Sequence, residues 1–250
     1  MKKIIFLAAF ACLSIGSIFA QNNFRGTIVY TATSTGETSF QVPDQISKAE
    51  VKVYDSKVLT SSPLFFGGNP FTISVLVDGN EQFTCMDLSQ LMMFFSQKDI
   101  ELDYTGSSKI LVSHKLTKDE IDSLTIPVTE GYYVEYVSGE TKTIAGKTAK
   151  KAVLHAFDEN GDDNATTVWY TDEIGPEVNL IFNGVKGVAL EYSMNLGEGR
   201  QLTLSASEIK SGKVKEVDML LPSGYETISE KDFTSLFEQI QEELKYLQDE

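Results

Sequence analysis

The chain has 250 residues, with 36 acidic residues against 21 basic ones and a formal net charge of −15 at pH 7. An acidic surface of this kind repels phosphate backbones and anionic lipid head groups, which argues against nucleic-acid binding and against electrostatic docking on a membrane. Hydrophobic residues make up 42% of the chain, and a protein of this length buries a core unaided.

The first twenty residues are typical of a secretory signal peptide. Lys2 and Lys3 precede an apolar run that continues to Ala20, and polar residues 21–23 follow it. We therefore predict cleavage after Ala20 and a protein that works in the periplasm or outside the cell. Lipid anchoring at Cys12 is the alternative, but the apolar stretch continues past this cysteine, where a lipidated tail would be polar. No later run is long and apolar enough to span a bilayer.

Cleavage leaves one predicted domain over residues 21–250, because no Pro-, Gly- or Ser-rich linker divides it. This part carries 19 basic residues against 36 acidic ones, a net charge of −17. Its one remaining cysteine, Cys85, has no partner for an intrachain disulfide, so hydrophobic packing must hold the fold together. We expect Cys85 to be a buried, unreactive thiol.

Period-two alternation of apolar and polar residues dominates the exported part. Residues 71–77, 188–195 and 202–206 each place their apolar side chains on one strand face, which is typical of antiparallel sheets. Turn-forming residues separate these runs, at positions 78–80, 145–146, 158–164, 197–199 and 211–212. From about residue 134 to residue 221 the pattern therefore predicts consecutive hairpins in an up-and-down meander.

Two segments break this alternation and are predicted to be helical. Residues 117–124 form a short helix in this interpretation, with Thr117 and Glu120 spaced as a capping box. Residues 229–247 carry apolar residues every three or four positions after Ser229 and Asp232, which have the same capping spacing. The polar face of this second helix is acidic, so we expect it to pack on the sheet and not on a membrane.

Two stretches contain more apolar residues than a strand with one buried face requires. Phe65, Phe66 and Phe71 surround the turn residues 67–70, and residues 91–95 would be apolar on both faces of a strand. Packing between a helix and a loop accounts for such a strand. A ligand cavity is the alternative, because Met and Phe line adaptable apolar pockets.

Two loop sequences resemble ligand-binding motifs. Residues 145–148 match the end of a phosphate-binding loop, but Thr141 stands where that motif needs its first glycine, and the setting is a hairpin turn. Residues 158–164 offer oxygen ligands at alternate positions, as calcium loops do, but Asp163 and Trp169 stand where an EF-hand needs glycine and glutamate. We therefore expect no phosphate site and favour an acidic hairpin tip at 158–164, with calcium binding as the alternative.

The sequence offers no constellation for catalysis. His114 and His155 are the two histidines, and neither has a second histidine, a cysteine or a carboxylate at metal-ligand spacing. No Gly-x-Ser-x-Gly sequence supports a hydrolase triad. We predict no catalytic residue, no metal site and no cofactor, and a structural role for His155 on a strand.

Three motifs in series carry a resemblance. Residues 144–152 read IAGKTAKKA, residues 168–174 read VWYTDEI, and residues 184–192 read GVKGVALEY. This series resembles a family of exported bacterial proteins of unknown function, although residues 147–149 depart from the Tyr and Cys that usually follow its glycine. The resemblance implies a fold similar to the outer-membrane lipoprotein carriers, a curved antiparallel half-barrel whose concave face holds helices and an acyl chain. It implies no known activity and no functional residue.

We therefore predict a mainly β protein, a curved half-barrel sheet with helix 229–247 and the shorter helix on its concave face. The leading functional hypothesis is an envelope protein that binds or carries an apolar ligand, such as an acyl chain or a lipoprotein. Its candidate wall residues are Phe65, Phe66, Met92, Phe94, Trp169 and Tyr192. The alternative is a non-enzymatic protein–protein interaction module of the envelope, with the loop at 65–71 as its anchor.

Overall fold

The computed structural model describes residues 24–35, 48–66, 69–117, 132–157, 161, 163–179, 185–197 and 200–249. The predicted signal peptide, the predicted short helix beyond Thr117 and most of the tip at 158–164 lie outside the described residues.

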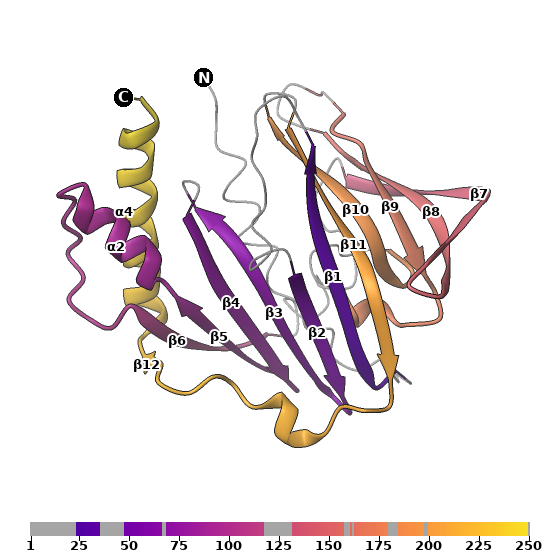
Figure 1. Ribbon diagram of the computed structural model, residues 1–250, viewed down its shortest axis with the longest axis horizontal. Coiled ribbons are helices and arrows are strands. Elements are labelled where there is room, and N and C mark those ends of the chain that lie inside the picture. The colour runs from indigo at the N-terminus through magenta and orange to yellow at the C-terminus, as the bar shows by residue number, and fades with distance from the viewer. Residues whose placement is uncertain are drawn as a thin grey trace.

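A single sheet organises the described chain (Figure 1). Its strands are β1 (Gly26–Thr35), β2 (Lys48–Tyr54), β3 (Lys57–Phe66), β4 (Asn69–Asp78), β5 (Glu81–Asp87), β6 (Lys109–Lys115), β7 (Tyr132–Ile144), β8 (Lys147–Ala156), β9 (Thr166–Thr171), β10 (Val188–Gly197), β11 (Arg200–Ser211) and β12 (Glu226–Thr227). They lie in the order β12-β6-β5-β4-β3-β2-β1-β11-β10-β9-β8-β7. All pairs are antiparallel except β12 with β6, so the mainly β, antiparallel prediction is confirmed.

The predicted meander is present as β7 to β11, each strand pairing with the next along the chain. Ala145 and Gly146 make the two-residue turn between β7 and β8, with φ of 46° and 78°. Two successive positive φ values are those of the type I′ turn that suits a tight hairpin. Residues 145–148 therefore belong to a hairpin, which agrees with the rejection of a phosphate-binding loop.

Cross-strand register defines two faces of the sheet. Val75 lies opposite Thr60, Thr60 opposite Val51, and Val51 opposite Ile28, and directly opposed residues share a face. We call this the inner face, because the helices α2 (Ser89–Gln97) and α4 (Glu230–Asp249) pack on it at the β4–β6 end (Figure 1).

Two apolar clusters share the inner face. The meander core joins β1, β2 and β8–β10 and includes the fully buried Ile28, Tyr30, Val168, Leu190 and Tyr192. The segment before β10 closes it, because the buried Asn179 donates to Gly187 O at 3.0 Å and accepts from Ala189 N at 2.6 Å. The helix-end core joins β4–β6 to α2 and α4 through Ile73, Met86, Leu91, Phe95, Leu236 and Ile240.

A third, smaller cluster lies on the opposite, outer face of the sheet. Leu59 and Leu76 pack there against Val214 and Met219. Met219 belongs to the short helix η3 (Glu216–Met219), which follows β11. The chain thus crosses the outer face on its way from β11 to β12.

Residues 91–95 form part of α2, so their interpretation as a strand was wrong. Leu91 and Phe95 are one helical turn apart and both are buried toward the sheet, whereas Met93 between them is 51% exposed. Short apolar runs do not distinguish a buried strand from a helix by periodicity. Met92 and Phe94 pack partly buried against the helix-end core, so packing accounts for every apolar residue of the run except Met93.

The C-terminal helix is confirmed as α4 (Glu230–Asp249). Ser229 caps the helix as its spacing to Asp232 predicts: Asp232 N donates to Ser229 Oγ at 3.1 Å, and Ser229 Oγ in turn donates to Asp232 Oδ2 at 2.6 Å. Leu236 and Ile240 are buried in the helix-end core. The helix therefore covers the β4–β6 end of the inner face and leaves the meander core to be closed by other segments (Figure 1).

Candidate functional site

A recess of about 260 Å³ lies between α2 and the segment that follows it. We call it the α2 recess, and it is lined by Met92, Phe95, Ser96, Asp99, Ile100, Glu101, Leu102 and Tyr104. Met92, Phe95, Ile100, Leu102 and Tyr104 also belong to the helix-end core or pack against it. The recess is therefore a gap at the margin of an apolar cluster, with polar residues at its opening.

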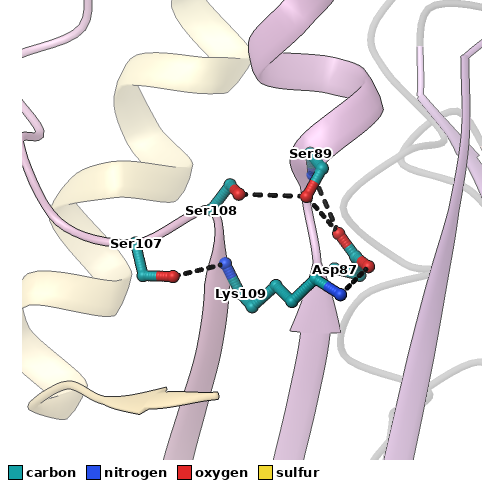
Figure 2. Close-up of polar contacts among 5 residues, drawn as sticks. All are labelled: Asp87, Ser89, Ser107, Ser108 and Lys109. Carbon is teal, nitrogen blue, oxygen red and sulfur yellow. Dashed lines mark hydrogen bonds and ion pairs between the residues drawn. The ribbon is translucent and has the colours of Figure 1, made fainter. Parts of the chain in front are cut away.

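Polar side chains at the start of α2 hold this helix over the sheet (Figure 2). Asp87 Oδ1 accepts from Ser89 N at 3.1 Å and from Ser89 Oγ at 2.6 Å, and Asp87 Oδ2 pairs with Lys109 Nζ at 3.2 Å. Ser89 Oγ also lies 3.0 Å from Ser108 Oγ. The end of β5, the start of α2 and the start of β6 are thereby tied together.

The carboxyl group of Asp87 titrates abnormally because of these contacts. Its partial burial raises the pKa, but hydrogen bonds from Ser89 and the Lys109 ammonium lower it by more, so the pKa lies below the ordinary value. Asp87 therefore stays ionised and caps the first turn of α2 at neutral pH, in place of a side-chain cap from Leu88.

The second wall of the α2 recess is the segment 99–104. Ile100 N donates to Phe95 O at 3.0 Å, which turns the chain back along α2, and Asp99 takes a positive φ of 56° in this turn. Ile100, Leu102 and Tyr104 then alternate toward the helix-end core. Asp103 N donates to Gln239 Oε1 of α4 at 2.7 Å, so both helices fix this wall.

Tyr104 closes the far end of the segment. Its hydroxyl donates to Ser107 O at 3.0 Å, and Ser107 N donates to Glu226 Oε2 of β12 at 2.7 Å. A Cβ on Gly106 would lie 2.5 Å from the Tyr104 hydroxyl, so glycine is required for this close approach. Burial raises the pKa of Tyr104, and the carboxylates of Glu226 and Asp232 raise it further.

The structure brings two of the six predicted wall residues together. Met92 lines the α2 recess, and Phe94 packs partly buried against the same core, with its ring 6.0 Å from that of Phe95. Phe65 and Phe66 are the last residues of β3, and their side chains lie outside what the structure describes, as does the anchor role proposed for the loop at 65–71.

Trp169 and Tyr192 lie apart from the α2 recess and on opposite faces of the sheet. Tyr192 is opposite Val168 in the meander core, so its neighbour Glu191 and the cross-strand Trp169 face outward. Lys142 Nζ lies 4.4 Å from the centroid of the Trp169 ring and 2.5 Å from Glu191 Oε1. A lysine therefore covers Trp169, whose ring also packs, partly buried, at the margin of the meander core.

Of the eight recess residues, only Met92 was named as a wall residue from the sequence; those missed are Phe95, Ser96, Asp99, Ile100, Glu101, Leu102 and Tyr104. The alternation of Ile100, Leu102 and Tyr104 is a signal that identifies one apolar face of this segment. The alternation does not predict that this segment packs against α2, because residues 91–95 of that helix were interpreted as a strand.

Folding brings carboxylates to both histidines from other parts of the chain. His155 Nδ1 lies 2.7 Å from Asp163 Oδ2 and its ring stacks on Tyr133 at 4.4 Å, while His114 Nδ1 lies 2.8 Å from Glu230 Oε1. Within the described residues no group of three or more His, Cys, Asp or Glu side chains is placed to hold a metal ion. His155 thus has the ring and ion-pair contacts of a structural side chain.

Cys85 is a free cysteine with 1% of its surface exposed, on β5. Burial raises the pKa of its thiol to about 11, so the thiolate is scarce at neutral pH. The expectation that Cys85 is buried is confirmed, and its unreactive character stays a prediction.

No protein-family model matches the chain, and no curated protein matches it. Among solved structures it is similar to PNGF-II, with 14% identity over 86% of this chain and 33% of that one, at a TM-score of 0.40. It is similar to MucB in complex with MucA(peri), with 12% identity over 81% of this chain and 55% of that one, at a TM-score of 0.32. A LolA superfamily protein from Nitrosomonas europaea has 12% identity over 85% of this chain and 97% of its own, at a TM-score of 0.21.

The chain thus spans about a third of the PNGF-II chain and about half of the MucB chain. At these identities and TM-scores the likenesses say nothing about the function of the chain. In the part of the chain that the structure describes, no helix has the length and apolar character needed to cross a bilayer.

Proposed function

We propose that the protein is an exported, non-catalytic binding protein that takes an apolar group of its ligand, such as the end of an acyl chain, into the α2 recess. The observation that carries the proposal is the recess itself, walled by Met92, Phe95 and Leu102 at the margin of the helix-end core. Four of the eight lining residues are apolar and four carry polar groups, and small-molecule sites combine apolar contacts with polar groups that orient the ligand.

The size of the recess limits what it holds. Pockets that enclose a whole drug-sized ligand measure about 300–1,000 Å³, and the α2 recess measures about 260 Å³. It therefore suits one apolar group or a short alkyl segment, and the rest of the ligand stays outside. Burying a group the size of a leucine or phenylalanine side chain stabilises a complex by about 1.5–3 kcal/mol, which corresponds to weak affinity unless further contacts form.

The export part of the proposal rests on the residues that precede the described chain. Lys2, Lys3 and the apolar run to Ala20 support secretion. A net charge of −15 favours solubility outside the cytosol, and the fold needs no disulfide bond.

Filling the recess tests the proposal. Binding is measured with the neutral fluorescent dye phenylnaphthylamine and by its displacement with octanol, on the full exported chain. Met92→Trp places a large ring in the recess, and we expect it to weaken octanol binding at least about tenfold, because the apolar contacts are lost. Met93→Trp is the matched control, since Met93 adjoins Met92 but is 51% exposed and does not line the recess.

Two results would overturn the proposal. One is dye that is not displaced by octanol from the unsubstituted protein. The other is equal loss of binding in the Met92→Trp and Met93→Trp variants with both still folded by circular dichroism, because the bound group would then lie elsewhere.

A further inference from the structure

The opening of the α2 recess carries negative charge. Asp99 and Glu101 line it, and both are exposed. None of the eight lining residues, all of which the structure describes, is a lysine, an arginine or a histidine. Neither carboxylate takes part in an ion pair with another described residue, so their charge is directed to solvent and to whatever enters the recess.

The surroundings reinforce this charge. Glu226 and Asp232 lie close enough to Tyr104, at the rear wall, to raise its pKa in addition to the effect of burial. Lys109 is held by Asp87 at 3.2 Å on the side of the α2 start. Lys98 precedes Asp99 but does not line the recess. The local field therefore favours a cation beside the apolar walls.

We infer that the ligand of the α2 recess is a cationic amphiphile, with a protonated amine next to a short apolar group. The inference rests on the proposed function and names the chemical class of its ligand. The alkyl part would contact Met92, Phe95 and Leu102, and the ammonium would lie against Asp99 and Glu101 at the opening. An anionic amphiphile of the same length, such as a fatty acid, is disfavoured because its carboxylate would meet two others.

The expected preference is modest, because both carboxylates are exposed and water screens them. Exposed ion pairs contribute little individually, so two of them together favour an ammonium over a neutral group roughly threefold to tenfold. The same screening makes the preference sensitive to salt, since the Debye length falls from about 10 Å at 0.1 M to about 3 Å at 1 M.

Three ligands that share one alkyl chain test the inference. Octylammonium, octanol and octanoate are each titrated into the full exported chain with bound phenylnaphthylamine, at low and at high salt. We expect octylammonium to displace the dye at roughly threefold to tenfold lower concentration than octanol, and octanoate to be the weakest. The advantage of octylammonium should shrink toward onefold at 1 M salt.

Variants that remove the two charges test whether the ammonium binds at Asp99 and Glu101. Asp99→Asn and Glu101→Gln together should abolish the advantage of octylammonium over octanol, measured as the ratio of the two affinities in the same variant. Asparagine tolerates the positive φ of 56° at position 99, so the turn is kept. Asp55→Asn is the matched control, because Asp55 has a similar φ of 51°, lies in the turn between β2 and β3 and does not line the recess.

The outcomes separate this inference from the proposed function. Failure of all three ligands to displace the dye overturns both. Equal displacement by octylammonium and octanol, or stronger displacement by octanoate, overturns the charge inference and leaves apolar binding in place. An advantage for octylammonium that survives the double substitution also overturns it, because the ammonium would then be recognised at another site.

Discussion

The two ends of the inner face are covered in different ways. At the meander end, Tyr30 and Tyr192 are almost wholly buried, and Asn179 satisfies the buried backbone groups of the segment that closes the core. At the helix end, α2 and α4 lie across β4–β6 and leave the α2 recess between α2 and segment 99–104. Binding sites are therefore expected at the helix end.

The largest expected difference between the two ends is in how much free energy of unfolding is lost when a side chain is shortened. Leu190→Ala in the filled meander core should lower the free energy of unfolding by about 2–5 kcal/mol, because Leu190 has no exposed surface and its removal leaves a cavity. Met92→Ala, beside an existing gap, should cost less than about 2 kcal/mol. Urea denaturation of both variants measures the difference, and a cost for Met92→Ala equal to that for Leu190→Ala would contradict the contrast.

The two ends should also respond to pH in opposite directions. The pKa of Asp87 is lowered, so its cap on α2 contributes above the unfolded value of about 3.9 and is lost as pH falls through the lower, folded value. The pKa of His155 is raised by its hydrogen bond to Asp163 and further by Glu135, so this contact contributes below about 6.5 and is lost as pH rises through the folded value.

Side-chain NMR signals recorded as a function of pH measure both responses. The Met92 methyl group reports on the helix end, and the Tyr133 ring reports on the β7–β8 edge. We expect Asp87→Asn to remove the acid-induced change at Met92, and His155→Gln to remove the change at Tyr133 that occurs as pH rises through the folded pKa of His155. If Asp87→Asn retained the full acid response at Met92, the cap would not be its cause.

The smallest effect is expected on the outer face. Lys142→Ala removes an ion pair to Glu191 and a cation–π contact to Trp169, both partly exposed. We expect a loss of at most about 1 kcal/mol in thermal or urea denaturation and no change in dye binding. A change in octanol affinity would show that Trp169 belongs to the ligand site, as the sequence hypothesis had it.

Strands and their turns were readable from the sequence because alternation and turn chemistry are local. The hairpin at Ala145 and Gly146 and the capping contact between Ser229 and Asp232 are of this kind, and the structure confirms them. The sequence did not predict the recess, because the recess depends on α2 and on how segment 99–104 turns back along this helix. Five consecutive apolar residues at 91–95 carry no period that separates helix from strand, and the start signal lay in Asp87 and Ser89.

Trp169 shows a second limit of sequence reasoning. Alternation places Trp169 and Val168 on opposite faces of β9, but it does not say which of them shares a face with Tyr192 on β10. A one-residue shift in register exchanges the faces, and the pairing of β9 with β10 contains such an irregularity between Ala189 and Glu191. Two aromatic residues on neighbouring strands are therefore not evidence of a shared wall.

The path from β11 across the outer face to β12 and α4 has a consequence for biosynthesis. Every strand from β1 to β11, and helix α2, is translated before α4, the second helix that covers β4–β6. Until α4 is synthesised, the apolar surface that Leu236 and Ile240 cover stays exposed and is a target for chaperones. A chain interrupted before residue 226 would retain its meander and every residue that lines the α2 recess, but it would lack the Gln239 contact that fixes segment 99–104.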